Sequence, residues 1–233
     1  MKRVTILLFL LWVTMEIQAR EAEEEILPAV EGGAFFFEVT TQFLSFSPRD
    51  LDGHLVLGNA EQVFYIPRVK SSLGFGIGFG RRFRSGLWSI SYLASGHDVS
   101  FQDRKSTAVS HVIQLNSRTF LLKTSPLKIF AHFGLNFPWL KVYDNAADKQ
   151  GLVCDATYLG VGVNVGTGLL VPISSRMLFS GSLIYRYIAY LYAKGPGRGI
   201  DVTDLFEDRN GPRHPLFLRS PVFALELSLA YTL

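Results

Sequence analysis

The chain has 233 residues, of which 48% are hydrophobic and only 18% are charged, whereas soluble domains typically carry about 25% charged residues. The formal net charge of +3 is too small to indicate a nucleic-acid-binding protein. Cys154 is the single cysteine, which excludes an internal disulfide framework.

The N-terminus has the layout of a secretory signal peptide. Lys2 and Arg3 precede an apolar run over residues 4–13, and the small residue Ala19 follows at the expected cleavage position. The run is shorter than the roughly 20 residues that a membrane-spanning helix needs. We therefore expect residues 1–19 to be a cleaved signal peptide and residues 20–32 to be a short segment ahead of the first strand.

Eight segments alternate between apolar and polar or small residues with a period of two, which is typical of β-strands. In chain order they cover residues 34–46, 73–83, 87–95, 110–122, 127–139, 157–170, 177–192 and 220–233. In the second segment the apolar row from Leu73 to Phe79 alternates with glycines 74, 76, 78 and 80, and the sixth segment has a similar glycine row. The sequence therefore predicts an all-β fold.

The connections between these segments alternate in length. Short connections with turn residues follow the second, fourth and sixth segments, around the sequences RSG, KTSP and VPISS. The other four connections are longer and cover roughly residues 47–72, 98–108, 144–156 and 195–219. This alternation is typical of an antiparallel up-and-down barrel with short turns at one end and longer loops at the other.

The glycine rows indicate which face of the barrel is inside. In a soluble barrel the apolar face would be the core, and glycine rows would face water, where glycine only weakens the strand. In a membrane barrel the apolar face contacts lipid, and glycine leaves room inside for larger side chains such as Phe120, Phe130, Tyr158 and Arg186. We therefore predict an eight-stranded antiparallel transmembrane β-barrel over residues 33–233, with a soluble barrel as the alternative.

The last segment carries an outward apolar row of Phe223, Leu225, Leu227, Leu229, Tyr231 and Leu233. In this pattern the chain resembles the small eight-stranded outer-membrane proteins of the OmpA, OmpX and OmpW kind, although Leu233 stands where phenylalanine is usual. The resemblance implies that this row is the signal read by the barrel-assembly machinery. It also implies a bacterial outer-membrane location, with outer-membrane lipid and periplasmic chaperones as partners, short periplasmic turns, longer outer loops and a periplasmic segment 20–32.

Six ionisable side chains fall on the inward face: Glu38, Arg118, Lys128, His132, Arg186 and Glu226. Charges in a filled lumen of low dielectric are costly unless they are paired. The two glutamates lie on the first and last strands, which must meet when the barrel closes. We expect a paired network that plugs the lumen. The alternative is a charge-lined conduit, for which eight strands leave little free bore.

The sequence predicts no catalytic residue. The seventh segment and its exit resemble the outer-membrane lipid A deacylases, whose strand carries a histidine and a serine. Matching that strand to Tyr185 and Arg186 puts Ala189 at the histidine position and Leu191 at the serine position, and neither can act as base or nucleophile. A pairing of His111 with a serine of a neighbouring strand, such as Ser95, stays open.

No metal or cofactor is expected, because His54, His97 and His214 fall in loops or at strand ends without close ligand spacing. The favoured function is a non-catalytic outer-membrane barrel with a largely plugged lumen, whose loops serve structural or interaction roles. A narrow transport barrel and a deacylase-like barrel without the His/Ser pair are the alternatives. Nucleic acid is not an expected partner, and the sequence does not identify an extracellular ligand.

Overall fold

The structure, a computed structural model, describes residues 33–46, 54–57, 62–65, 68–101, 104–122, 127–148, 152–195, 200–201 and 218–233. The expected signal peptide and the segment 20–32 lie outside these residues. Within the described ranges, no helix has both the length and the apolar character needed to cross a membrane.

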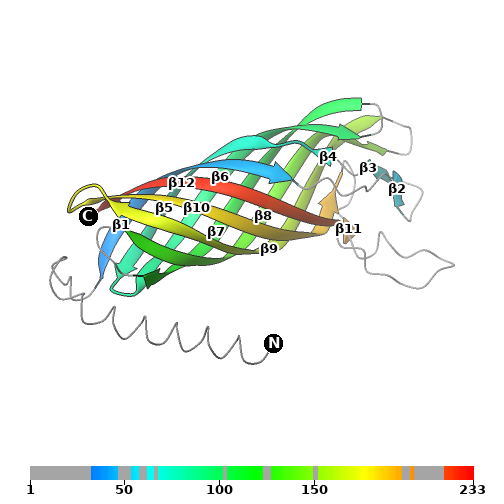
Figure 1. Ribbon diagram of the computed structural model, residues 1–233. Helices are drawn as coiled ribbons and strands as arrows, with labels where there is room; N and C mark the ends of the chain where they lie inside the picture. Colours follow the sequence, from blue (N-terminus) through cyan, green and yellow to red (C-terminus); the bar gives the residue numbers. More distant parts are fainter. Residues whose placement is uncertain are drawn as a thin grey trace, which may run out of the picture.

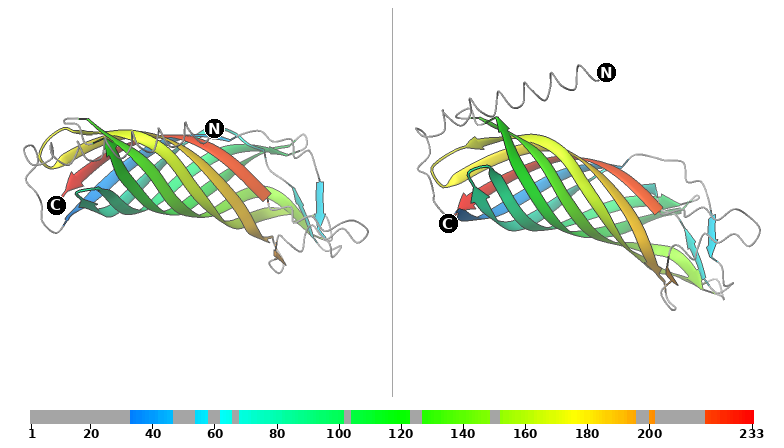
Figure 2. Two further views of the ribbon diagram at one scale, coloured as in Figure 1. Left: turned by 60° about the horizontal axis from the view of Figure 1, so that its bottom comes forward. Right: turned by 90° about the horizontal axis from the view of Figure 1, so that it is seen from below.

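Eight long strands form the wall of a closed barrel. They are β1 (Ala34–Phe46), β5 (Ser72–Phe83), β6 (Gly86–Phe101), β7 (Arg104–Leu122), β8 (Lys128–Asp148), β9 (Val153–Pro172), β10 (Met177–Lys194) and β12 (Leu218–Thr232). Each pairs antiparallel with the next, and β12 also pairs with β1, so the sheet closes on itself. Figures 1 and 2 show the strands tilted around one axis. The predicted all-β, eight-stranded antiparallel barrel is confirmed.

The described residues include four short strands at the end of the barrel away from the C-terminus (Figure 1). They are β2 (His54–Leu57), β3 (Gln62–Tyr65), β4 (Arg68–Val69) and β11 (Ile200–Asp201). β3 joins β2 to the edge of β8, while β4 and β11 pair with β6 and β10. We call this the loop end. The opposite end, which carries the turns at 84–85 and 173–176 and the residue Leu233, is called the turn end.

Two of the four connections expected to be long are mostly strand. β6 and β7 stay paired as far as Phe101 and Arg104, and β8 and β9 as far as Ala147 and Val153. Many outward residues are polar here, such as Asp98 and Lys105, although Val153 is an exposed apolar one, while inward residues such as Val99 stay buried. The alternation therefore continues with a largely polar outward row, which hides it from a search for apolar rows.

Away from the loop end, the outward face is apolar on every wall strand. Phe75 of β5 is 66% exposed, whereas Glu38, which lies opposite Gly78 in the β1–β5 register, is fully buried. Exposed residues of the same kind on the other strands include Ile90, Leu115, Phe133, Val163, Leu183 and Leu227. An apolar surface of this extent needs an apolar environment. The alternative of a soluble barrel, with the apolar face as its core, does not fit this arrangement.

The interior has three layers. A polar band in the middle is flanked towards the turn end by an apolar cluster that contains Phe36, Phe120 and Phe130. Towards the loop end lies a second apolar cluster, which contains Leu140, Ile188 and other buried residues. Phe120, Phe130 and Tyr158 were expected inside from the glycine rows, and they belong to these clusters, whereas the clusters themselves were not predicted.

The glycine row of β5 allows its neighbours to approach closely. A Cβ added at Gly80 would lie 2.1 Å from the Trp88 carbonyl oxygen and 2.6 Å from Cζ of Phe36. Gly96 faces outward, and a Cβ there would meet nothing within 4 Å.

We expect Gly80→Ala to lower the free energy of unfolding by about 1–3 kcal/mol, because the backbone oxygen cannot move away without disturbing the sheet. Gly96→Ala should be neutral or stabilising by up to about 1 kcal/mol, because it restricts only the unfolded chain. Urea unfolding of both variants in lipid vesicles measures the difference. Equal effects at the two positions would contradict the close packing at Gly80.

Candidate functional site

The centre of the interior is a buried group of opposite charges. Arg118 of β7 donates from Nη1 to Glu38 Oε2 (2.8 Å) and from Nη2 to Glu226 Oε1 (3.1 Å). All three side chains are at most 3% exposed. The glutamates come from the two strands that close the barrel, and the arginine reaches them from the opposite wall. One guanidinium therefore neutralises both carboxylates in part and ties three strands together.

A second arginine completes the charge balance. Arg186 of β10 donates from Nη2 to Gln42 Oε1 (2.7 Å), and the same nitrogen lies 4.0 Å from Glu226 Oε2. Gln42 in turn donates from Nε2 to Glu226. Two arginines thus face two glutamates, which is the pairing that buried charges require.

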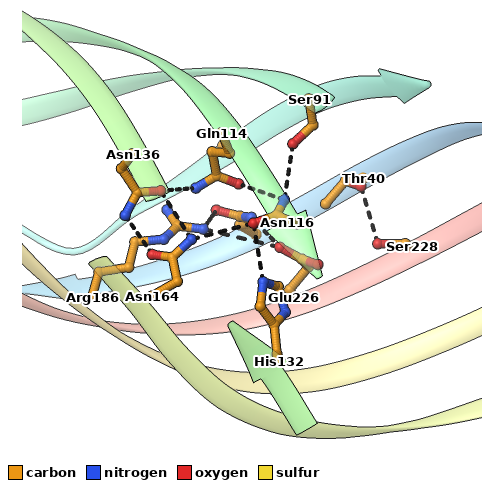
Figure 3. Close-up of polar contacts among 12 residues, drawn as sticks. Thr40, Ser91, Gln114, Asn116, His132, Asn136, Asn164, Arg186, Glu226 and Ser228 are labelled. Carbon is orange, nitrogen blue, oxygen red and sulfur yellow. Dashed lines mark hydrogen bonds and ion pairs between the residues drawn. The ribbon is translucent and has the colours of Figure 1, made fainter. Parts of the chain in front are cut away.

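Neutral amides extend this group across the barrel (Figure 3). Asn136 and Asn164 exchange reciprocal amide hydrogen bonds of 2.5 and 2.9 Å. Gln114 donates to Asn136 Oδ1 (2.9 Å). Asn116 accepts from His132 Nε2 at 3.1 Å. The amides act as both donors and acceptors, so they satisfy one another without adding charge.

The structure brings five of the six expected lumen residues together: Glu38, Arg118, His132, Arg186 and Glu226. Lys128 is also buried, but its ammonium lies 4.9 Å from the ring centroid of Phe120, in the apolar cluster of the turn end. Phe130 separates it from His132 on the inward face of β8. Its place at the first residue of the strand explains why the network contacts described above do not include it.

Sequence reasoning missed the neutral members of the network. Gln42, Gln114, Asn116, Asn136 and Asn164 are all buried at inward positions. Their signal was present in the alternation, because each occupies the inward face of its segment. An amide at such a position is as informative as a charge, since it too needs a partner inside.

Within the described part of the barrel, a small cavity of about 20 Å³ lies on the loop side of the network, with Gln42 and Arg186 as polar lining and Leu140 and Ile188 as apolar lining. A volume of this size suits one or two water molecules, whereas a cavity that holds benzene measures about 150 Å³. The cavity is therefore much smaller than most solutes that a conduit would carry.

His111, which was considered for catalysis, and His97, which was considered as a metal ligand, each contact other side chains. Tyr92 Oη lies 2.5 Å from His111 Nδ1, and the His111 ring stacks on Trp139 at 5.0 Å between centroids. A pairing of Ser95 with His111 was left open by the sequence, but the hydroxyl of Ser95 contacts another histidine. Its Oγ lies 2.8 Å from Nε2 of the buried His97, and Ser72 Oγ lies 2.7 Å from Nδ1 of the same ring. These hydroxyls satisfy both nitrogens of a buried imidazole.

The described residues also contain no group of three or more His, Cys, Asp or Glu side chains that could hold a metal ion. The residues expected to form the assembly signal lie outward on β12, with the C-terminal residue just beyond it, and all are exposed: Phe223, Leu225, Leu227, Leu229, Tyr231 and Leu233.

Comparison with known proteins gives a likeness of fold. No protein-family model matches the chain, and no curated protein matches its sequence. Neisserial surface protein A (NspA) aligns with a TM-score of 0.51 and 13% identity over 87% of this chain and 99% of that chain. The outer membrane protein OprG from Pseudomonas aeruginosa aligns with a TM-score of 0.48 and 14% identity, over 86% of this chain and 97% of that one. A major outer membrane protein from Thermus thermophilus aligns with a TM-score of 0.48 and 10% identity, over 86% of this chain and 100% of that one.

At 13% identity the likeness to NspA shows the fold alone. As a likeness of fold, the expected resemblance to small eight-stranded outer-membrane barrels is confirmed.

Proposed function

We propose that the protein is an integral outer-membrane β-barrel, non-catalytic, with a plugged lumen and surface loops in structural or interaction roles. The observation that carries this proposal is the division of the wall into two faces. Away from the loop end, the outward face is apolar on all eight strands, while Arg118 and its two carboxylates are buried inside. Lipid outside and a filled polar interior explain both faces at once.

Export and assembly follow from the same proposal. The signal peptide 1–19 would direct the chain to the periplasm, where chaperones carry it to the barrel-assembly machinery. The exposed row of β12, from Phe223 to Tyr231, would be the element that the machinery reads. The turn end would then face the periplasm, together with residues 20–32, and the loop end would face outward.

The plug is the reason for preferring a scaffold to a conduit. A solute would have to pass the ring cluster of Phe36, Phe120 and Phe130 and then the hydrogen-bonded network around Arg118. Opening such a path would break buried charge pairs, which is costly. The loops at the other end are then the part of the barrel that remains for contact with partners.

We expect the purified full chain to give no steady conductance in planar bilayers, because the phenylalanine cluster and the central network would both have to open for ions to pass. Insertion is checked in the same preparation by protection of the barrel from added protease. The Phe130→Ala variant, which thins only the turn-end cluster, should stay silent as well, because the central network remains. A reproducible conductance of the native protein would contradict the plug and support the narrow transport barrel.

The outer-membrane location needs its own measurement. After expression of the full chain in a Gram-negative host, the mature protein should sediment with the outer-membrane fraction of a density gradient. Recovery in the soluble periplasmic fraction would contradict the proposal.

A further inference from the structure

The two arginines of the central network are neutralised to different degrees. Arg118 makes direct hydrogen bonds to both carboxylates, at 2.8 and 3.1 Å. Arg186 instead donates from Nη2 to the neutral amide oxygen of Gln42, and Oε2 of Glu226 lies 4.0 Å from the same nitrogen. The positive charge of Arg186 is therefore the less compensated of the two.

One edge of the Arg186 guanidinium lacks a protein partner. The side chain is only 3% exposed, and its Nε has no hydrogen-bond partner among the residues that the structure describes. A buried N–H of a charged group is costly to leave without an acceptor. This nitrogen therefore needs an acceptor from the space beside it.

That space is the cavity on the loop side of the network, which measures about 20 Å³. Arg186 of β10 and Ser110 of β7 both line it. Ser110 is 8% exposed, and its hydroxyl makes no hydrogen bond within the described part of the chain. The described lining residues are otherwise mostly apolar, and none of them is acidic. The cavity wall therefore offers a cation and a free hydroxyl donor without a carboxylate.

A monatomic anion suits this cavity better than an organic anion or water. The volume admits about one or two particles the size of water, so phosphate and organic carboxylates are too large. A water molecule would accept from Nε but would also need acceptors for its own hydrogens, and the guanidinium offers none. A buried anion needs donors and a paired cation, which Ser110 and Arg186 supply.

We propose that the barrel binds one chloride ion in this cavity, between the Arg186 guanidinium and the Ser110 hydroxyl. β10 and β7 are not neighbours in the sheet, so the ion would join separate parts of the wall. It would complete the plug by satisfying the guanidinium rather than pass through the barrel. The site lies in the interior and does not depend on the membrane location, so it can be tested in detergent micelles.

The first test follows urea unfolding of the full chain in micelles by tryptophan fluorescence, while sodium chloride replaces sodium gluconate at constant ionic strength. Gluconate is too large for the cavity. One chloride bound to the folded state alone should raise the folded-to-unfolded ratio about tenfold for each tenfold rise in chloride above its dissociation constant. Arg186→Gln should abolish this dependence. The readout is the slope against chloride concentration, so a lower starting stability of the variant does not affect it.

Two matched serine variants locate the site. Ser110→Val removes the hydroxyl and fills part of the cavity, so chloride should no longer stabilise the barrel. Ser180→Val makes the same exchange at a buried inward position of β10 that does not line the cavity, and it should keep the native dependence. Equal slopes in the two variants, or no chloride dependence of the native protein, would overturn the site.

Crystals of the full chain grown in sodium bromide give a direct readout, because bromide replaces chloride and scatters anomalously. The expected result is one anomalous peak in the cavity, beside Arg186. Density for water at that position without an anomalous signal would overturn the proposal.

Discussion

Replacing Arg118 by methionine should lower the free energy of unfolding by about 3–5 kcal/mol, because it leaves Glu38 and Glu226 buried without their shared cation. Both carboxylates lie within 3.1 Å of the guanidinium, and all three groups are almost fully buried. Methionine has a comparable side-chain volume, so the loss measures charge rather than a large cavity. Urea unfolding in lipid vesicles, followed by tryptophan fluorescence, gives the value.

Two further variants make the measurement specific. Adding Glu38→Gln to Arg118→Met should recover part of the loss, because Glu226 can still pair with Arg186. Lys141→Met breaks an exposed ion pair with Asp155 and should change stability little, because water screens that pair. If Arg118→Met lowered the free energy of unfolding as little as Lys141→Met does, the central network would not stabilise the folded barrel.

The architecture could be predicted from the sequence because a strand has a period of two. The alternation in residues 34–46 and 73–83 identifies the inward positions, and the glycine row at 74–80 shows which face has little room. Glu38 and Arg118 could therefore be assigned to the lumen before any contact was known.

The contacts themselves depend on strand register, which alternation does not specify. Across the seam, Glu38 lies opposite Ala230 and Gln42 lies opposite Glu226, so the two glutamates are not neighbours in the ladder. Only the closed barrel shows that Arg118 reaches both from the far wall. Lys128 has the same inward face and charge as Arg118, yet its position at the strand end places it beside Phe120 instead.

The outward face can be tested with two valines of the same strand. Val163 lies in the middle of β9, opposite Leu135 of β8 and Tyr187 of β10, and Val171 lies just before the turn. Both side chains are outward and exposed, at 48% and 37%. They differ chiefly in their distance from the turn end.

Val163→Arg should lower the free energy of unfolding in lipid vesicles by about 2–4 kcal/mol, whereas Val171→Arg should cost about 0–1 kcal/mol. The difference arises because an arginine at the middle of the hydrocarbon layer cannot reach water, while one near the turn end can extend to the headgroups. The native barrel already carries an outward arginine at that level, Arg81 of β5. If the barrel were soluble, both positions would face water, and the two arginines would be tolerated equally. A depth-dependent cost is therefore the result that separates a lipid-facing wall from a solvent-facing one.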